Sequence, residues 1–421
     1  MADAAAKATV EAVWRIESAR LVAGLARVVR DVGLAEDLAQ DALVAALEQW
    51  PSSGVPANPG AWLTAVARRR YVDGVRRQAS FERRVPEIAR QLAEAADPMA
   101  DIEFGARVED DVLRLIFTAC HPALSRDARV ALTLKLVAGL STEQIARAFL
   151  VSSPTMAARV TRAKKALADA SVPFEVPAGA ELAARLASVL EVVYLIFNEG
   201  YSATSGESWT RAELCEEAMR LGRMLAALAP DEPEAHGLVA LMEIQASRIP
   251  ARTGRDGELI TLLHQDRGRW NRLLITHGLA ALGTAESLSG SESSGPYVIQ
   301  AALAACHARA PAAADTDWNR IVALYDVLLS LVPSPVVELN RAVAVSMAEG
   351  PAAGLAIVDA LAGSPALRGY HLLPSVRGDL LDRLGRRAEA RAEFERAAAM
   401  TANASERAHL LARAARAAAG G

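Results

Sequence analysis

The segment from Leu140 to Leu167 constrains the possible fold more than any other part of the chain. Ser141 is a suitable N-cap for a short helix, and Gln144 three residues later completes a capping-box pattern. A second helix is predicted to begin at the Ser153-Pro154 step, because proline at the first helical position lacks only an amide that would be unpaired there. This spacing predicts a helix-turn-helix, whose second helix can enter the major groove of DNA.

The second helix of this motif ends in a cationic run that includes Lys164. A cationic helix face can hold the phosphates that border the groove. The residues expected to dock a DNA duplex are Ser153, Thr155, Arg159, Thr161, Arg162 and Lys165. The alternative is a helical hairpin that only packs inside an all-helical protein, because such hairpins are a general motif.

An amphipathic helix is predicted from Val28 to Trp50, because apolar residues recur there at helical spacing. Its apolar face consists of Leu38, Ala42, Leu43, Ala46 and Leu47. Its outer face, which we expect to be exposed, carries Glu36, Asp37, Gln40 and Asp41.

A second helix is predicted from Ala61 to Arg84, with Trp62, Leu63 and Val66 in the core. Seven arginines and no lysine lie in its last seventeen residues: Arg68, Arg69, Arg70, Arg76, Arg77, Arg83 and Arg84. Arginine offers a rigid fork to phosphates and stacks on bases, whereas lysine is only a point charge. If this arginine run stood alone, a solvated helix face would be favoured over a nucleic-acid-binding one. Here the run accompanies a second basic helix downstream.

Three segments, in this order, resemble the extracytoplasmic-function sigma factors of bacterial RNA polymerase. Residues 31–50 resemble the region that grips the β′ clamp helices of the polymerase, residues 61–77 the helix that opens and reads the promoter −10 element, and residues 127–167 the domain that reads the −35 element. Three matching segments together are far more specific than one hairpin.

The resemblance implies partners and roles for particular residues. Core RNA polymerase, through its β′ clamp helices and β flap, and promoter DNA are the implied partners. The implied polymerase-binding residues are Glu36, Asp37, Gln40 and Asp41, with Leu38 packing beneath them. The residues implied to hold, melt and read the −10 strand are Trp62, Arg68, Arg69, Arg70, Asp73, Arg76 and Arg77, since single-stranded bases need flat surfaces and phosphate clamps.

Two departures limit what the resemblance implies about base preference. Many relatives have Asn at the position of Arg69, where a flipped −10 base is read. The −35 reading helix presents Ala157 and Ala158, where polar base-readers are common. The binding surfaces are carried over from the family, but the base preferences are not.

The second half of the chain resembles the carboxy-terminal extension of one subgroup of these factors, which carries a tetratricopeptide-like domain. The matching segments are residues 194–203, 295–308, 315–326 and 333–345. The predicted domains are sigma region 2 at 1–85, an acidic linker at 86–110, sigma region 4 at 111–172 and the helical extension at 178–421.

Degenerate repeats are expected in the extension, because stacked helical repeats require small or bulky apolar residues at fixed offsets. The candidate repeat positions are Ala218, Gly222, Leu225, Pro230, Ala240, Ile321, Tyr325, Leu328, Pro333, Gly378, Ala390, Phe394 and Ala397. A loop is expected at residues 287–295, and a generic helical solenoid is the alternative to tetratricopeptide repeats. Either would offer a curved surface to a protein or small-molecule regulator.

The composition predicts an all-α protein, because Ala and Leu dominate and no alternating β pattern persists. The net charge of −4 averages a basic start over acidic segments. The run from Pro86 to Asp111, which spans the linker, collects Glu87, Glu94, Asp97, Asp101, Glu103, Glu109, Asp110 and Asp111. It could track the RNA exit path or mimic nucleic acid, and a solvated spacer is the alternative.

Three dispersed cysteines, Cys120, Cys215 and Cys306, are expected to be buried, reduced thiols in the cytoplasm rather than zinc ligands. Neither a signal segment nor an eighteen-residue apolar stretch indicates export or a membrane. We expect no cofactor or metal.

No catalytic motif is recognisable, and His236, His264 and His277 lack acid or nucleophile partners at useful spacing, so we expect no enzyme. Asn198, Glu199 and Tyr201 are expected to cap helices and fix an inter-domain contact rather than catalyse. The alternatives to a sigma factor are a DNA-binding regulator that acts without polymerase and a scaffold for RNA or acidic partners.

Overall fold

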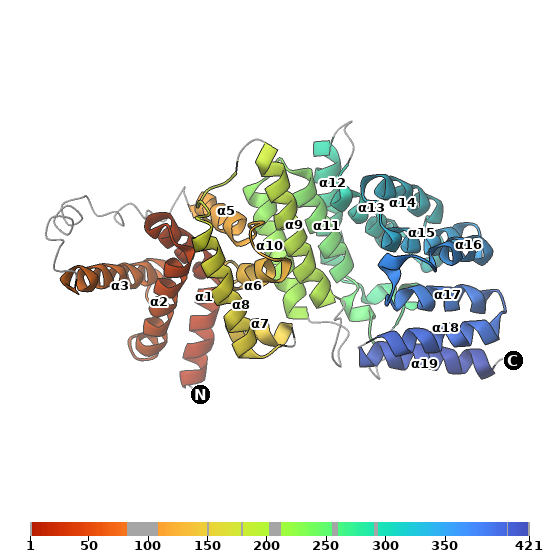
Figure 1. The fold of residues 1–421 in the computed structure, drawn as a ribbon, viewed down its shortest axis with the longest axis horizontal. Coiled ribbons are helices and arrows are strands. Elements are labelled where there is room, and N and C mark those ends of the chain that lie inside the picture. The colour runs from red at the N-terminus through yellow and green to blue at the C-terminus, as the bar shows by residue number, and fades with distance from the viewer. Residues whose placement is uncertain are drawn as a thin grey trace. The chain divides into compact units, whose positions relative to one another are not determined.

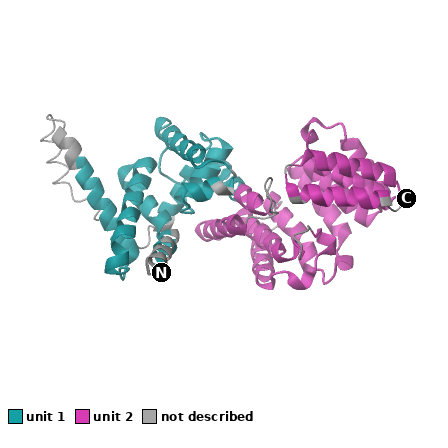
Figure 2. Cartoon of the chain, turned by 90° about the horizontal axis from the view of Figure 1, so that it is seen from below, with its two compact units in different colours: residues 1–193 teal, residues 194–421 magenta. Residues whose placement is uncertain are grey.

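The computed structural model describes residues 2–81, 108–149, 151–177, 180–201, 212–254, 260–289, 294–401 and 403–419. Within these ranges every regular element is a helix, as predicted for an all-α chain. The chain forms two compact units, residues 1–193 and residues 194–421 (Figure 2).

Unit 1 contains seven described helices and the beginning of an eighth (Figure 1). They are α1 (Ala2–Val29), α2 (Val32–Ser53), α3 (Pro59–Phe81), α5 (Val108–Ala119), α6 (Arg126–Leu136), α7 (Thr142–Ala148), α8 (Ser153–Asp169) and α9 (Ala180–Tyr201). Helix α1 packs along both α2 and α5, so the amino-terminal helices and the helix-turn-helix share one body.

The single helix predicted from Val28 to Trp50 is wrong at its beginning. Arg30 adopts a left-handed conformation with φ 55°, which separates α1 from α2. The Asp31 carboxylate then accepts a hydrogen bond of 2.9 Å from the Leu34 amide and caps α2. Asp31 could have indicated this helix start in the sequence, because aspartate is a preferred N-cap residue.

The predicted helix-turn-helix is present as α7 and α8. The capping box is confirmed, because the Ser141 amide donates to Gln144 Oε1 at 2.7 Å and the Gln144 amide donates to Ser141 Oγ at 3.2 Å. Helix α8 begins at Ser153 with Ser152 as its N-cap, so Pro154 is its second residue rather than its first. Leu140 and Ile145 are buried between these helices and their neighbours.

Unit 2 is a series of helices, most of them packed mainly against their neighbours in the chain, whereas α13 packs mainly against α11 (Figure 1). They are α10 (Ala212–Leu228), α11 (Pro233–Ala246), α12 (Arg272–Ser289), α13 (Pro296–Arg309), α14 (Trp318–Leu331), α15 (Pro335–Ala348), α16 (Pro351–Leu361), α17 (Leu372–Arg383), α18 (Arg387–Met400) and α19 (Ala404–Ala419). Short 3-10 turns are η1 (Ile249–Ala251), η2 (Leu262–His264), η3 (Arg267–Arg269), η4 (Ala313–Asp315) and η5 (Pro365–Leu367).

Several candidate repeat positions lie where these helices approach most closely. A Cβ at Gly378 would lie 2.8 Å from the ring of Phe394, so α17 and α18 can approach closely only with glycine there. The buried positions among the candidates are Ala218, Gly222, Leu225, Ala240, Ile321, Leu328, Gly378, Ala390, Phe394 and Ala397. Helix α12 extends through Ser289, into the expected loop, and residues 290–293 lie outside the described part of the chain.

Helix α9 begins in unit 1 and ends in unit 2. In unit 1, the buried Arg185 donates a hydrogen bond of 2.9 Å to the Phe117 carbonyl, and Ser188 donates one of 2.9 Å to the Cys120 carbonyl. These carbonyls end α5 and have no further helical turn to bond to. The first helix after the helix-turn-helix is therefore part of the unit 1 core.

Candidate polymerase and promoter interface

The polar face of α2 is the candidate polymerase surface. Asp37 and Asp41 are exposed, Gln40 is partly exposed, and Leu38 is buried beneath them at 6% exposure. Glu36 departs from the expectation of an exposed outer face, because it is only 5% exposed.

Two lysines from the helix-turn-helix region cover Glu36. Lys164 of α8 bonds to one carboxylate oxygen of Glu36 and lies 3.0 Å from Oδ1 of Asp37. Lys135 of α6 lies 3.5 Å from the other Glu36 oxygen. Burial opposes the charge on Lys164, but the hydrogen bonds to Glu36 and Asp37 outweigh it and raise its pKa, so the ammonium form is favoured.

Helix α3 presents the candidate −10 residues. The Trp62 ring packs edge-on against Trp50, with 5.3 Å between ring centroids, which anchors α3 on α2. Arg70 is exposed and Arg69 is 87% exposed, while Arg68 and Asp73 are partly buried. Asp73 lies 4.0 Å from Arg69, one helical turn away.

The remaining arginines of the run lie at the end of α3 and beyond it. Arg76 and Arg77 belong to α3, but their side chains lie outside the described part of the structure. Arg83 and Arg84 follow Phe81 and lie outside the described residues altogether.

Helix α8 has one buried and one exposed face. Met156, Val160, Ala163 and Leu167 are buried on the first. Thr155, Thr161, Arg162 and Lys165 are exposed, and Ser153 and Arg159 are partly exposed. Arg159 lies 3.6 Å from Asp127. The predicted duplex-docking residues therefore share the solvent side of α8.

The predicted acidic linker lies almost wholly outside the described residues. Asp111, which ends the acidic run, is not solvated, because it is 3% exposed within α5. Asp111 lies 3.0 Å from Arg27 of α1 and 2.6 Å from Arg114. The interpretation of Asp111 as part of a spacer is wrong, and its burial follows from these two arginines.

The cysteines are buried and free of disulfides, as expected. Burial raises the pKa of Cys120 to about 11 and that of Cys215 to about 12, so both thiols are weak nucleophiles at neutral pH. Within the described ranges, three or more His, Cys, Asp or Glu side chains nowhere gather as a metal site would require. The described helices also include none with the length and apolar character to cross a bilayer.

The extension residues Asn198, Glu199 and Tyr201 lie in the last turns of α9. A side-chain hydrogen bond links Asn198 to Tyr194. The Tyr201 ring packs beneath the Arg252 guanidinium at 4.0 Å, and its carbonyl accepts a hydrogen bond of 2.5 Å from the same group. Asn198 and Tyr201 thus make structural contacts within unit 2.

Comparison with known proteins identifies three parts of the chain. Residues 16–81 match sigma-70 region 2, residues 114–167 match sigma-70 region 4, and residues 185–286 match a family of unknown function, DUF6596. The two sigma matches contain α2, α3 and the helix-turn-helix, on which the candidate interface lies.

Three relatives illustrate the extent of similarity. An uncharacterized protein of Rhizobium meliloti (strain 1021) is 48% identical over 92% of this chain and 90% of its own length. The extracytoplasmic-function (ECF) RNA polymerase sigma factor SigC of Mycobacterium tuberculosis (strain CDC 1551 / Oshkosh) is 32% identical over 40% of this chain and 82% of its own length. The ECF RNA polymerase sigma factor SigK of Mycobacterium sp. (strain KMS) is 30% identical over 34% of this chain and 72% of its own length.

Proposed function

Since the chain belongs to the extracytoplasmic-function family of RNA polymerase sigma factors, we propose that it binds core polymerase through α2 and directs promoter-specific initiation. The binding surfaces on the polymerase would be the β′ clamp helices and the β flap. The protein would act in the cytoplasm, without a cofactor and without catalysing a reaction of its own.

One observation carries this proposal. The sigma-70 region 2 and region 4 matches include α3 and α8, and both helices carry exposed arginines or lysines. Exposed cations on a helix that is anchored by its opposite face are suited to phosphates and unstacked bases. Arg69 and Arg70 on α3 would contact the −10 strand, and Arg162 and Lys165 on α8 the −35 duplex.

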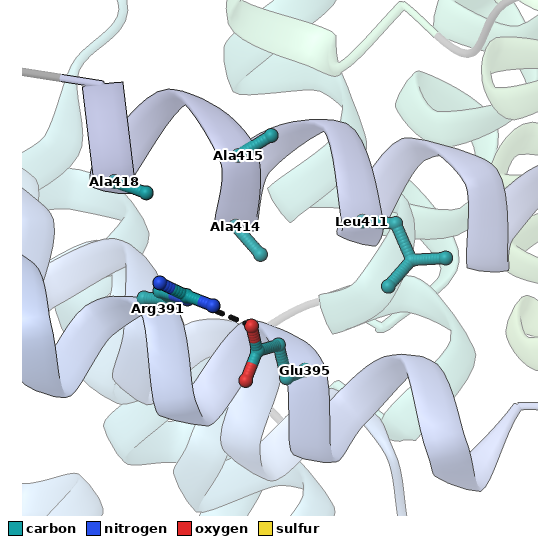
Figure 3. Close-up of a pocket in the computed structure, with 6 residues that line it drawn as sticks. All are labelled: Arg391, Glu395, Leu411, Ala414, Ala415 and Ala418. Atoms are coloured by element: carbon teal, nitrogen blue, oxygen red, sulfur yellow. Dashed lines mark hydrogen bonds and ion pairs between the residues drawn. The ribbon is translucent and has the colours of Figure 1, made fainter.

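We propose further that unit 2 is a tetratricopeptide-like solenoid that modulates activity. Support comes from the buried repeat positions and from the sequential packing of its helices. A shallow pocket lies between α18 and α19, where Leu411 and the Arg391–Glu395 ion pair face one another across small side chains (Figure 3). It marks one place where a regulator could bind.

The alternative is a DNA-binding regulator that acts without polymerase. The helix-turn-helix fits both functions, but the region 2 match with its polar α2 face fits only the sigma factor. Co-purification with core polymerase separates the two.

The double substitution Gln40→Lys/Asp41→Lys tests the polymerase surface. Both positions lie on the solvent side of α2, so the fold should persist while association with core polymerase is lost. The matched control is Glu48→Lys/Gln49→Lys, which makes the same charge change at exposed positions farther along α2. Undiminished pull-down of core polymerase by the first variant would refute this surface.

A further inference from the structure

The acidic end of α2 lies against the DNA-reading region of the same chain. Lys164, in the cationic run of α8, contacts Glu36 and Asp37, which the proposed function assigns to polymerase. Lys135, on α6 of region 4, also approaches Glu36. Two of the proposed polymerase contacts are thereby occupied within unit 1.

Charge compensation favours the contact between Lys164 and Glu36. A carboxylate at 5% exposure needs compensation, and two lysines supply it at Glu36. Lys164 is itself only 17% exposed in its side chain, so the pair is shielded from salt more than a surface pair would be. Both ion-pair partners of Glu36 lie on α8 and α6, so separating these helices from α2 would remove the two charges that compensate it.

The contact is part of a wider seam between the two sigma regions. Asp111 of α5 forms an ion pair with Arg27 of α1, with 3.0 Å between Oδ2 and Nε. The turn at Gly139 abuts Ser18 and Trp14 of α1. Region 4 is therefore seated on region 2 along α1 as well as on α2.

We propose that the free protein is closed, with Lys164 bound in the acidic site of α2 that polymerase must use. This inference rests on the proposed function. A Lys164 ammonium engaged with Glu36 and Asp37 cannot contact phosphate at the same time, so closure buries Glu36, engages Asp37 and holds a cation of the reading helix. Opening releases both, and polymerase binding and opening are thermodynamically linked.

The geometry at Gly33 provides a direct test. A Cβ placed on Gly33 lies 3.8 Å from the Cβ of Lys164, the spacing found across native disulfides. It also lies 3.0 Å from Oδ1 of Asp31, a side-chain atom that can shift by a few tenths of an ångström. The double variant Gly33→Cys/Lys164→Cys in the full chain should therefore form a disulfide that locks the closed state. The natural cysteines are buried and should not compete.

The reduced and oxidised forms of this variant are then compared for binding to purified core polymerase. Reduced protein lacks the Lys164 ammonium and should bind at least as tightly as the unsubstituted chain. Oxidised protein should bind about tenfold more weakly or worse, and dithiothreitol should restore binding, because the competent fraction sets the apparent affinity. The single variants Gly33→Cys and Lys164→Cys should show no such redox dependence.

Each outcome is decisive. Failure of the disulfide to form would show that the free protein is not closed. A disulfide that forms without weakening polymerase binding would show that closure does not mask the surface. Absence of binding by the reduced variant and by the unsubstituted chain would instead overturn the proposed function.

A charge series provides a second measurement without a crosslink. Lys164→Ala should tighten apparent binding to core polymerase by roughly three- to tenfold, whereas Lys164→Arg keeps the positive charge and should leave it near that of the unsubstituted chain. Unchanged or weaker binding by Lys164→Ala would overturn the proposal.

Discussion

At the residue scale, the turn between α6 and α7 depends on one glycine. Gly139 has φ +69°, a conformation that a side chain disfavours. A Cβ there would also overlap the Ser18 hydroxyl of α1. The same residue therefore shapes the approach to the helix-turn-helix and allows α1 to pack against it.

Replacing Gly139 with Ala should lower the free energy of unfolding of unit 1 by about 1–3 kcal/mol, because strain and overlap add. Urea unfolding followed by tryptophan fluorescence would measure it. Gly74→Ala in α3 is the matched control, because a Cβ there meets open space and alanine favours helix. Equal stability of the two variants would contradict this account of the turn.

His307 gives unit 2 a dependence on pH. Burial, and then the nearby Arg248 and Arg267 charges, lower the pKa of His307 to about 3. The folded state therefore keeps this imidazole neutral, whereas the unfolded chain binds a proton below about pH 6.5. The neutral His307 imidazole therefore contributes its full stabilisation above about pH 6.5, and this stabilisation is lost as the pH falls toward 3.

His307→Gln should consequently reduce the loss of stability between pH 6.5 and 4.5, where this group alone contributes a slope of up to about 1.4 kcal/mol per pH unit. Denaturant unfolding at several pH values would measure the slope. The exposed His264→Gln serves as the control. An unchanged slope in the His307 variant would show that this imidazole is charged in the folded protein.

At the element scale, α9 is the piece that ties the extension to the sigma module. Its buried Arg185 and Ser188 bond to the carbonyls at the end of α5, and Leu186 and Val189 of the same turns are buried. Ending the chain after Ala170 would leave the α5 carbonyls without these partners, at a cost of about 1–3 kcal/mol for each buried group.

A chain that ends after Ala170 should thus unfold roughly 5–10 °C below one that ends after Val193, and should be less soluble. Thermal unfolding followed by circular dichroism compares them directly. Equal melting temperatures, or full transcription activity from the shorter chain, would show that α9 is dispensable to the sigma module.

The helices and their local caps could be predicted from sequence, but the seam between them could not. Ser141 and Gln144 cap α7 three residues apart, so their bonding is decided locally. Glu36 is buried by Lys164, which lies 128 residues away in the chain, and no spacing rule connects such positions. Arg30 was missed because left-handed backbone is unusual for arginine, although Asp31 marked the following helix.

At the scale of the whole molecule, the proposed function depends on surfaces carried by separate helices of unit 1. The candidate polymerase surface lies on α2, the candidate −10 residues on α3 and the candidate −35 residues on α8. Unit 2 adds a helical array to this module and is proposed to modulate it. The proposed function therefore requires that one chain bind polymerase and select DNA.

Transcription in vitro with purified core polymerase, over a library of genomic fragments with mapped RNA 5′ ends, tests this requirement most directly. We predict that the full chain yields a small set of start sites that share upstream sequence elements. Gln40→Lys/Asp41→Lys should abolish them. Arg76→Ala/Arg77→Ala should weaken them and flatten the salt dependence of promoter binding, because phosphate contacts are lost. Identical 5′ ends with and without the protein would contradict the assignment as a sigma factor.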